Sequence, residues 1–256
     1  MDNPDCSRHR PATDVPHSYK TVSSDPINAA ILLPKNLQPG LHPVIVNIHG
    51  GFFATGHSLF APWFRPWLLK LALDHNAIIV SADYRLLPTP NGIADQLADL
   101  EDFWQWFRGE LPALLESRGV KMDIGRLLLV GGSAGGYYAA QLALSRPDEI
   151  AALALTYPAV DLKDDIFVDG PAEGNPTVLH FPASEILPLS ESLAWVKQRR
   201  EIVASKGGFE ITPYCVSLAQ HECFSQEMFE YDTAELGVAE LPLERIRAGG
   251  RLPRNL

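Results

Sequence analysis

The sequence predicts a doubly wound α/β domain with a mainly parallel sheet, followed by a helical cap. Up to residue 158, apolar runs rich in β-branched residues alternate with helical stretches. Several of these runs are almost continuously apolar, as strands buried on both faces are. From Ala159 onward no strong strand follows. Alternation of this kind is typical of βαβ units, in which helices cover both faces of a sheet.

The predicted core covers residues 17–158. It is preceded by residues 1–16, where three prolines among polar residues predict a flexible lead-in. A hairpin turning at Asp25-Pro26 is expected to open the sheet. The predicted strands are 19–23, 27–33, 43–48, 77–81, 127–130 and 150–157, and the predicted helices are 59–75, 93–108 and 134–144.

The predicted cap covers residues 159–250. Its first part, 161–188, is rich in Asp, Gly and Pro. Short helices are expected at 189–204, 212–220 and 224–236. Residues 251–256 are interpreted as a truncated end, so the last strands of the sheet are expected to be missing.

The stretch from Arg126 to Gly136 predicts a strand, a sharp turn and a helix. Its centre, residues 131–135, is a G-x-S-x-G pentapeptide around Ser133. A serine at such an elbow is held in a strained backbone conformation, so its neighbours must lack side chains that would collide. The helix that follows points free N–H groups toward any negative charge beside Ser133. This geometry suits a tetrahedral oxyanion.

Three motifs follow three successive strands. His49-Gly50-Gly51 follows the first, Asp83-Tyr84-Arg85 the second and the pentapeptide the third. In this order they resemble the hormone-sensitive-lipase-like group of the α/β-hydrolase superfamily. Two departures are Phe52, where that group often has a third glycine, and Gly132, where it often has an acidic residue.

The resemblance implies a catalytic role for Ser133 as nucleophile, with backbone N–H groups of Gly50, Gly51 and Ala134 as oxyanion donors. It also implies structural roles for Asp83 and Arg85, and no cofactor or metal. Phe52, Phe53, Tyr137 and Tyr138 are candidates to line an acyl pocket, with core packing as the alternative.

The acid and the histidine of a catalytic triad are not identifiable. In the superfamily the acid and then the histidine follow the serine, but no histidine follows His221 and no apolar strand followed by an acid occurs after Tyr157. Asp161 is interpreted as structural. Three alternatives remain for the source of the base, namely His180, His221 or another chain.

Two functions therefore compete. The first is a serine hydrolase that cleaves a small-molecule carboxylic ester, or a related lactone or thioester, in a biosynthetic pathway of secondary metabolism. The second is a catalytically impaired hydrolase-like binding protein, or a remnant whose C-terminal third was lost through truncation or a gene-model error. An exposed sheet edge left by the missing strands predicts self-association.

Composition excludes several partner classes. The net charge is −10 with scattered basic residues, so neither nucleic acid nor an anionic membrane is an expected partner. The three cysteines lie outside metal-ligand spacings. No apolar run is long enough for a membrane span or a leader, and a cytoplasmic location is expected.

Overall fold

The structure is a computed structural model that describes residues 16–35, 37–171, 175–229 and 237–253. Its centre is a six-stranded sheet in the order β1-β2-β4-β3-β5-β6. β3, β4, β5 and β6 run parallel, and β1 and β2 add an antiparallel hairpin beside β4. The strands are β1 (His17–Val22), β2 (Asp25–Leu32), β3 (Gly40–Ile48), β4 (Ile78–Ala82), β5 (Val120–Gly132) and β6 (Ala152–Thr156).

Alternating strand residues supply two separate apolar layers. In β3, Val44 and Val46 face the larger core, while Ile45 faces the smaller one. β4 repeats the pattern, since Ile78 and Val80 lie in the larger core and Ile79 in the smaller. Helices therefore cover both faces, as the sequence predicts for a doubly wound sheet.

The helices of the core divide unevenly between the two faces. α1 (Pro66–Asp74) places Leu68 and Ala72 in the smaller core. α2 (Ile93–Gly109), α3 (Leu111–Glu116) and α4 (Ala134–Ser145) contribute to the larger core on the opposite face. The aromatic face of α2, with Phe103, Trp104 and Phe107, is almost entirely buried there.

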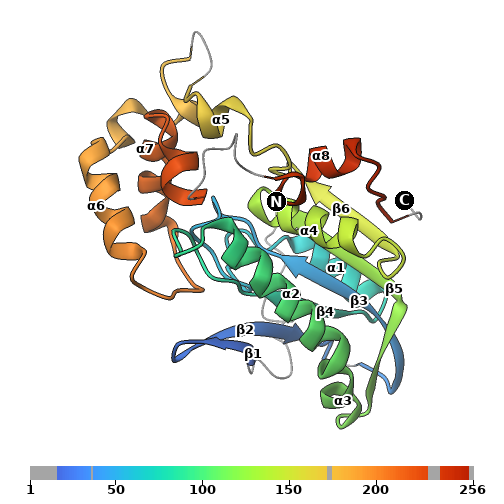
Figure 1. Ribbon diagram of the computed structural model, residues 1–256. Coiled ribbons are helices and arrows are strands. Elements are labelled where there is room, and N and C mark those ends of the chain that lie inside the picture. The colour runs from blue at the N-terminus through green and yellow to red at the C-terminus, as the bar shows by residue number, and fades with distance from the viewer. Residues whose placement is uncertain (1–15, 36, 172–174, 230–236, 254–256) are drawn as a thin grey trace, which may run out of the picture.

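After β6 the described chain consists of short helices. α5 (Asp165–Val168), α6 (Leu189–Arg199) and α7 (Thr212–Gln220) lie together at one end of the molecule (Figure 1). The last helix, α8 (Pro242–Arg247), belongs to the predicted cap range but packs against α4, where Arg245 donates to the backbone oxygen of Gln141 at 3.2 Å. Single 3₁₀ turns occupy 178–180, 183–185, 209–211 and 238–240, and a π-helical turn occupies 225–229.

Several elements differ from the sequence prediction, among them α3, which was not predicted, and α6, which ends at Arg199 rather than 204. The helix expected from residue 59 begins at Pro66, because Pro66 lacks a backbone N–H and suits only the first turn of a helix. β5 begins at Val120 rather than 127, and a register shift between Pro43 and Val44 accommodates its extra residues. The predicted helix at 224–236 lies partly outside the described residues. None of the described helices is long and apolar enough to cross a membrane.

We predict that Gly135→Ala destabilises the fold by about 3 kcal/mol or more, whereas Gly109→Ala is neutral or stabilising by up to about 1 kcal/mol. A Cβ on Gly135 would lie 2.2 Å from the backbone oxygen of Ile48 and 2.5 Å from that of His49, while one on Gly109 meets nothing within 4 Å. Urea unfolding of the two variants measures the difference. Equal stability would show that α4 can move away from β3 at little cost.

Candidate active site

Ser133 occupies a strained elbow between β5 and α4. Its φ of 52° and ψ of −127° lie outside the regions that ordinary residues prefer, at a cost of about 1–3 kcal/mol. The conformation is held by backbone bonds, in which the Ser133 N–H donates to Thr156 O at 3.1 Å and the Ala159 N–H donates to Ser133 O at 3.0 Å. Ser133 is partly exposed, whereas Gly132 and Ala134 on either side of it are buried.

Glycines let three backbone segments meet at this elbow. A Cβ on Gly131 would lie 2.1 Å from Gly135 O, and one on Gly50 would lie 2.6 Å from Gly132 O and 3.4 Å from Ser133 Cβ. The loop that follows β3 therefore packs directly on the turn that carries Ser133. This packing brings two of the predicted motifs together.

The N–H groups of Gly50, Gly51 and Ala134 are available at this junction. Among the hydrogen bonds of the described chain, none of these three donates to a protein acceptor. Ala134 is the first residue of α4, whose N-terminal end carries partial positive charge. The arrangement leaves backbone donors beside the Ser133 side chain.

An open pocket with a volume of about 190 Å³ lies over Ser133. One wall is aromatic, with Phe60 and Trp63 at a ring-centroid distance of 4.8 Å. Phe209, which follows α6, packs edge-on against both rings at 5.1 and 5.2 Å and is half exposed. A backbone bridge between Gly56 and Gly207 fixes this contact, so the cap range packs against the aromatic wall of the pocket.

His49 lies in the pocket wall but is buried, with 6% exposure. Its Nδ1 donates to Gly50 O at 2.8 Å, and its ring stacks on Tyr84 at 4.3 Å. Its Nε2 finds no hydrogen-bond partner in the described chain. Burial lowers the pKa of His49 to about 4, so the ring is neutral at physiological pH.

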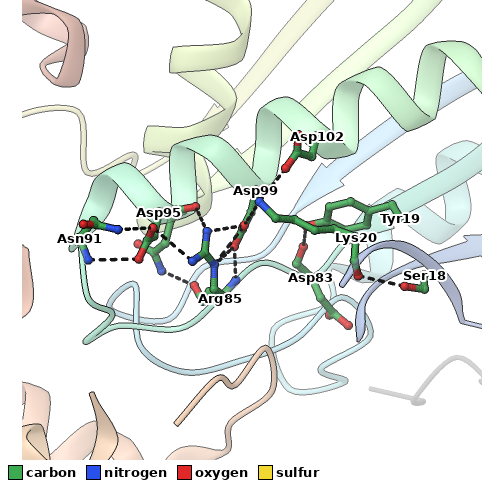
Figure 2. A network of polar contacts seen from close by, with 10 residues as sticks. Ser18, Tyr19, Lys20, Asp83, Arg85, Asn91, Asp95, Asp99 and Asp102 are labelled. Atoms are coloured by element: carbon green, nitrogen blue, oxygen red, sulfur yellow. Dashed lines mark hydrogen bonds and ion pairs between the residues drawn. The ribbon is translucent and has the colours of Figure 1, made fainter. Parts of the chain in front are cut away.

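Asp83 and Arg85 act as structural ties near the pocket, as the resemblance implies. Asp83 accepts from the Ser58 N–H at 2.6 Å. Arg85 donates from Nε and Nη2 to the carboxylate of Asp99, and Lys20 forms an ion pair with the same carboxylate at 2.8 Å (Figure 2). The network ties β1, the segment after β4 and α2 together.

Gln96 is a second tie that the sequence analysis did not single out. Its side-chain amide donates to Phe53 O at 2.7 Å and to Arg85 O at 2.6 Å, and its oxygen accepts from the Tyr138 hydroxyl. It therefore fixes the end of the glycine loop to α2. A glutamine on a helix face has no sequence signal for such a role.

Of the four aromatic residues considered for an acyl pocket, three lie in the core and one lines the Ser133 pocket. Phe53, Tyr137 and Tyr138 are almost completely buried and pack on one another, which is the core-packing alternative. Phe52 borders the Ser133 pocket. Of these four aromatic residues, Phe52 alone can therefore contact a ligand in the Ser133 pocket.

The candidate bases do not line the pocket. His180 and His221 are both exposed, and His221, which caps the end of α7, donates from Nδ1 to Ser217 O at 2.7 Å. Asp161 accepts from the Lys163 N–H at 3.0 Å in a turn, a structural role. Among the described residues no histidine hydrogen-bonds to Ser133, although His49 and His57 line the same pocket.

The sequence analysis also missed His57 and Arg65 as pocket residues. It placed 59–75 in one helix, which would have directed the Arg65 side chain differently, and it gave His57 no role. The prolines at 62 and 66 were the available signal that residues 59–65 form a loop. In the structure this loop supplies much of the pocket wall.

A family model described as alpha/beta hydrolase fold matches residues 45–237. The chain is similar to a probable carboxylesterase M8 of Phoma sp., with 40% identity over 153 residues that cover 58% of this chain and 48% of that protein. It is also similar to the non-reducing polyketide synthase Preu6 of Preussia isomera, with 37% identity over 50% of this chain and 6% of the synthase. The first of these relatives is thus matched over about half of its length.

A solved structure has the same fold. It is a hyperthermophilic esterase from the archaeon Pyrobaculum calidifontis, with a TM-score of 0.57 and 21% identity. The similarity covers 93% of this chain and 63% of the esterase chain. At this identity the likeness concerns the fold alone.

We predict that His49 makes the stability of the protein depend on pH. The unfolded state takes up a proton near pH 6.5 and the folded state only near pH 4, so stability is lost as the pH falls through this window. Between pH 7.5 and pH 5 the loss from this group is about 2 kcal/mol. Urea unfolding at pH 7.5 and pH 5 measures this loss of stability. His49→Phe is the control, because a variant without the imidazole should not show the contribution of His49. An identical loss in the variant would assign the pH dependence to other groups.

Proposed function

The chain belongs to the alpha/beta hydrolase fold family, and we propose that it is a serine hydrolase that cleaves a carboxylic ester through an acyl-enzyme on Ser133. The observation that carries the proposal is the strained Ser133 in a pocket, beside the unpaired N–H groups of Gly50, Gly51 and Ala134. The similarity to a probable carboxylesterase supports it.

In the proposed reaction Ser133 Oγ attacks the ester carbonyl carbon. The carbonyl oxygen becomes an oxyanion, and the three backbone N–H groups stabilise it. The carbon–oxygen ester bond then breaks, the alcohol leaves with a proton, and water hydrolyses the acyl-enzyme to the carboxylic acid and free Ser133. Donors already in place cost no reorganisation during the reaction, which is why such groups accelerate it strongly.

The reaction requires a base for the Ser133 proton. An imidazole is the group that performs this step at neutral pH in serine hydrolases. His57 and His49 are the described imidazoles that line the pocket, and burial lowers the pKa of both. Both are therefore largely neutral near pH 7 and able to accept a proton.

The substrate is proposed to be a small ester of secondary metabolism. The stretches similar to the polyketide synthase and to the carboxylesterase M8 support this context. A lactone or a thioester presents the same carbonyl to Ser133, and comparing hydrolysis of matched ester and thioester substrates separates these classes. A cytoplasmic location stays a prediction from composition.

A binding protein without catalysis is the competing function. It is favoured by the absence, among the described residues, of a histidine hydrogen-bonded to Ser133. The elbow would then hold an acid or ester without turning it over. Such a protein would bind ligands equally well with and without the Ser133 hydroxyl.

We predict that Ser133→Ala lowers p-nitrophenyl butyrate hydrolysis by at least about 10³-fold, because the nucleophile is removed while the fold is kept. The exposed Ser117→Ala is the control and keeps full activity. Thermal melting of both variants confirms folding. Unchanged turnover in folded Ser133→Ala protein would refute the assignment.

We also predict concentration-dependent self-association through the edge of β6, which pairs with β5 alone among the described strands. Light scattering coupled to size-exclusion chromatography measures it. Ala152→Lys, at the start of β6, is expected to favour the monomer. A monomer at all concentrations with a cooperative melt would contradict the prediction.

A further inference from the structure

Arg65 places a guanidinium beside the nucleophile. Pro66 restricts the preceding residue to extended backbone, and Arg65 has φ of −68° and ψ of 121°. From this position its side chain reaches the pocket and lies against Gly132. A Cβ on Gly132 would lie 1.6 Å from Arg65 Nη2, so the guanidinium occupies the space that a side chain at position 132 would fill.

The Arg65 guanidinium has no carboxylate partner among the described residues. Within the described chain, Arg65 makes no side-chain hydrogen bond and no ion pair, although most arginines described have one or the other. It is half-buried, and a half-buried cation without a partner loses hydration that a ligand can replace. The neighbouring pocket is the open space from which a ligand would reach it.

Among the described residues, no Asp or Glu lines the pocket, whereas the cationic Arg65 does. This contrasts with a chain that has 31 acidic and 21 basic residues. Within a low-dielectric wall formed partly by Phe60 and Trp63, the positive charge of Arg65 favours an anionic ligand.

We propose that Arg65 binds a free carboxylate on the ester that Ser133 cleaves, so that the pocket selects acidic esters over neutral ones. The proposal rests on the proposed function, and it adds the substrate class and a specificity-determining residue. A guanidinium binds a carboxylate through two parallel N–H bonds, which fixes its position as well as its charge. The aromatic wall would pack against the apolar part of the same molecule.

The test compares matched substrates. One pair carries the carboxylate on the acyl side, p-nitrophenyl hydrogen glutarate against its neutral methyl ester, and another carries it on the alcohol side, 4-acetoxybenzoate against methyl 4-acetoxybenzoate. For at least one pair, Arg65→Met is expected to lower the acid-to-neutral ratio of kcat/KM by about 10- to 100-fold. Arg65→Lys, which keeps the charge without the fork, is expected to retain part of the ratio.

Two outcomes would overturn the proposal. An unchanged ratio in both pairs would show that Arg65 does not contact the substrate carboxylate. An equal loss for the acidic and the neutral ester would show that Arg65 acts on the oxyanion or on the fold. Melting temperatures of the variants separate those two cases.

A second variant tests the same contact from the other side. In Gly132→Asp, the Cβ would lie 1.6 Å from Arg65 Nη2, so the guanidinium would have to move aside, and the new carboxylate beside it would neutralise its charge. The preference for acidic esters is then expected to fall as in Arg65→Met. An intact preference in folded Gly132→Asp protein would contradict the proposal.

Binding separates this inference from the proposed function. Calorimetric titration of Ser133→Ala with glutarate and with 4-hydroxybenzoate, the acidic products of the two pairs, requires no turnover. At least one is expected to bind, and Arg65→Met in the same background is expected to weaken it about 10- to 100-fold. Such a loss supports anion recognition even if no ester is cleaved, whereas binding indifferent to Arg65, or absent for both acids, would refute it.

Discussion

The site depends on the backbone contact between the elbow at Ser133 and the end of β3. Gly135 approaches the Ile48 and His49 carbonyl oxygens, and Gly50 approaches the Gly132 carbonyl, at distances that exclude a Cβ. This contact fixes the height of α4 against the sheet and the position of the glycine loop beside Ser133. Because the contact is between main-chain atoms, it leaves little freedom for Ser133 to relax from its strained conformation.

Around this contact, buried polar groups hold the loops. Gln96 bonds to the backbone oxygens of Phe53 and Arg85, and Arg85 in turn grips Asp99. Each donor bonds to an acceptor that would otherwise be buried without a hydrogen bond. The glycine loop is thereby anchored from α2 as well as from α4, while the pocket side of the loop stays open to a ligand.

Much of the fold is predictable from the sequence because its strands and glycine turns carry local signals. The apolar runs at 43–48 and 77–81 predict β3 and β4, and the pentapeptide predicts the turn into α4. The aromatic pocket wall is not predictable in this way, because it comes from the loop 59–65, whose rings Phe60 and Trp63 pack against Phe209 of the cap range. Pro62 and Pro66 are local signals that the helix begins late, but where the chain places the side chains of Arg65 and His57 depends on long-range contacts.

The central claim is that Ser133 is an activated nucleophile. Intact-mass analysis after reaction with a fluorophosphonate tests it most directly, because phosphonylation requires a serine whose proton a base can accept. The account predicts one adduct per chain, located on Ser133 by peptide mapping and absent from Ser133→Ala. Folded protein that stays unlabelled, or that carries the adduct on another residue, would contradict it.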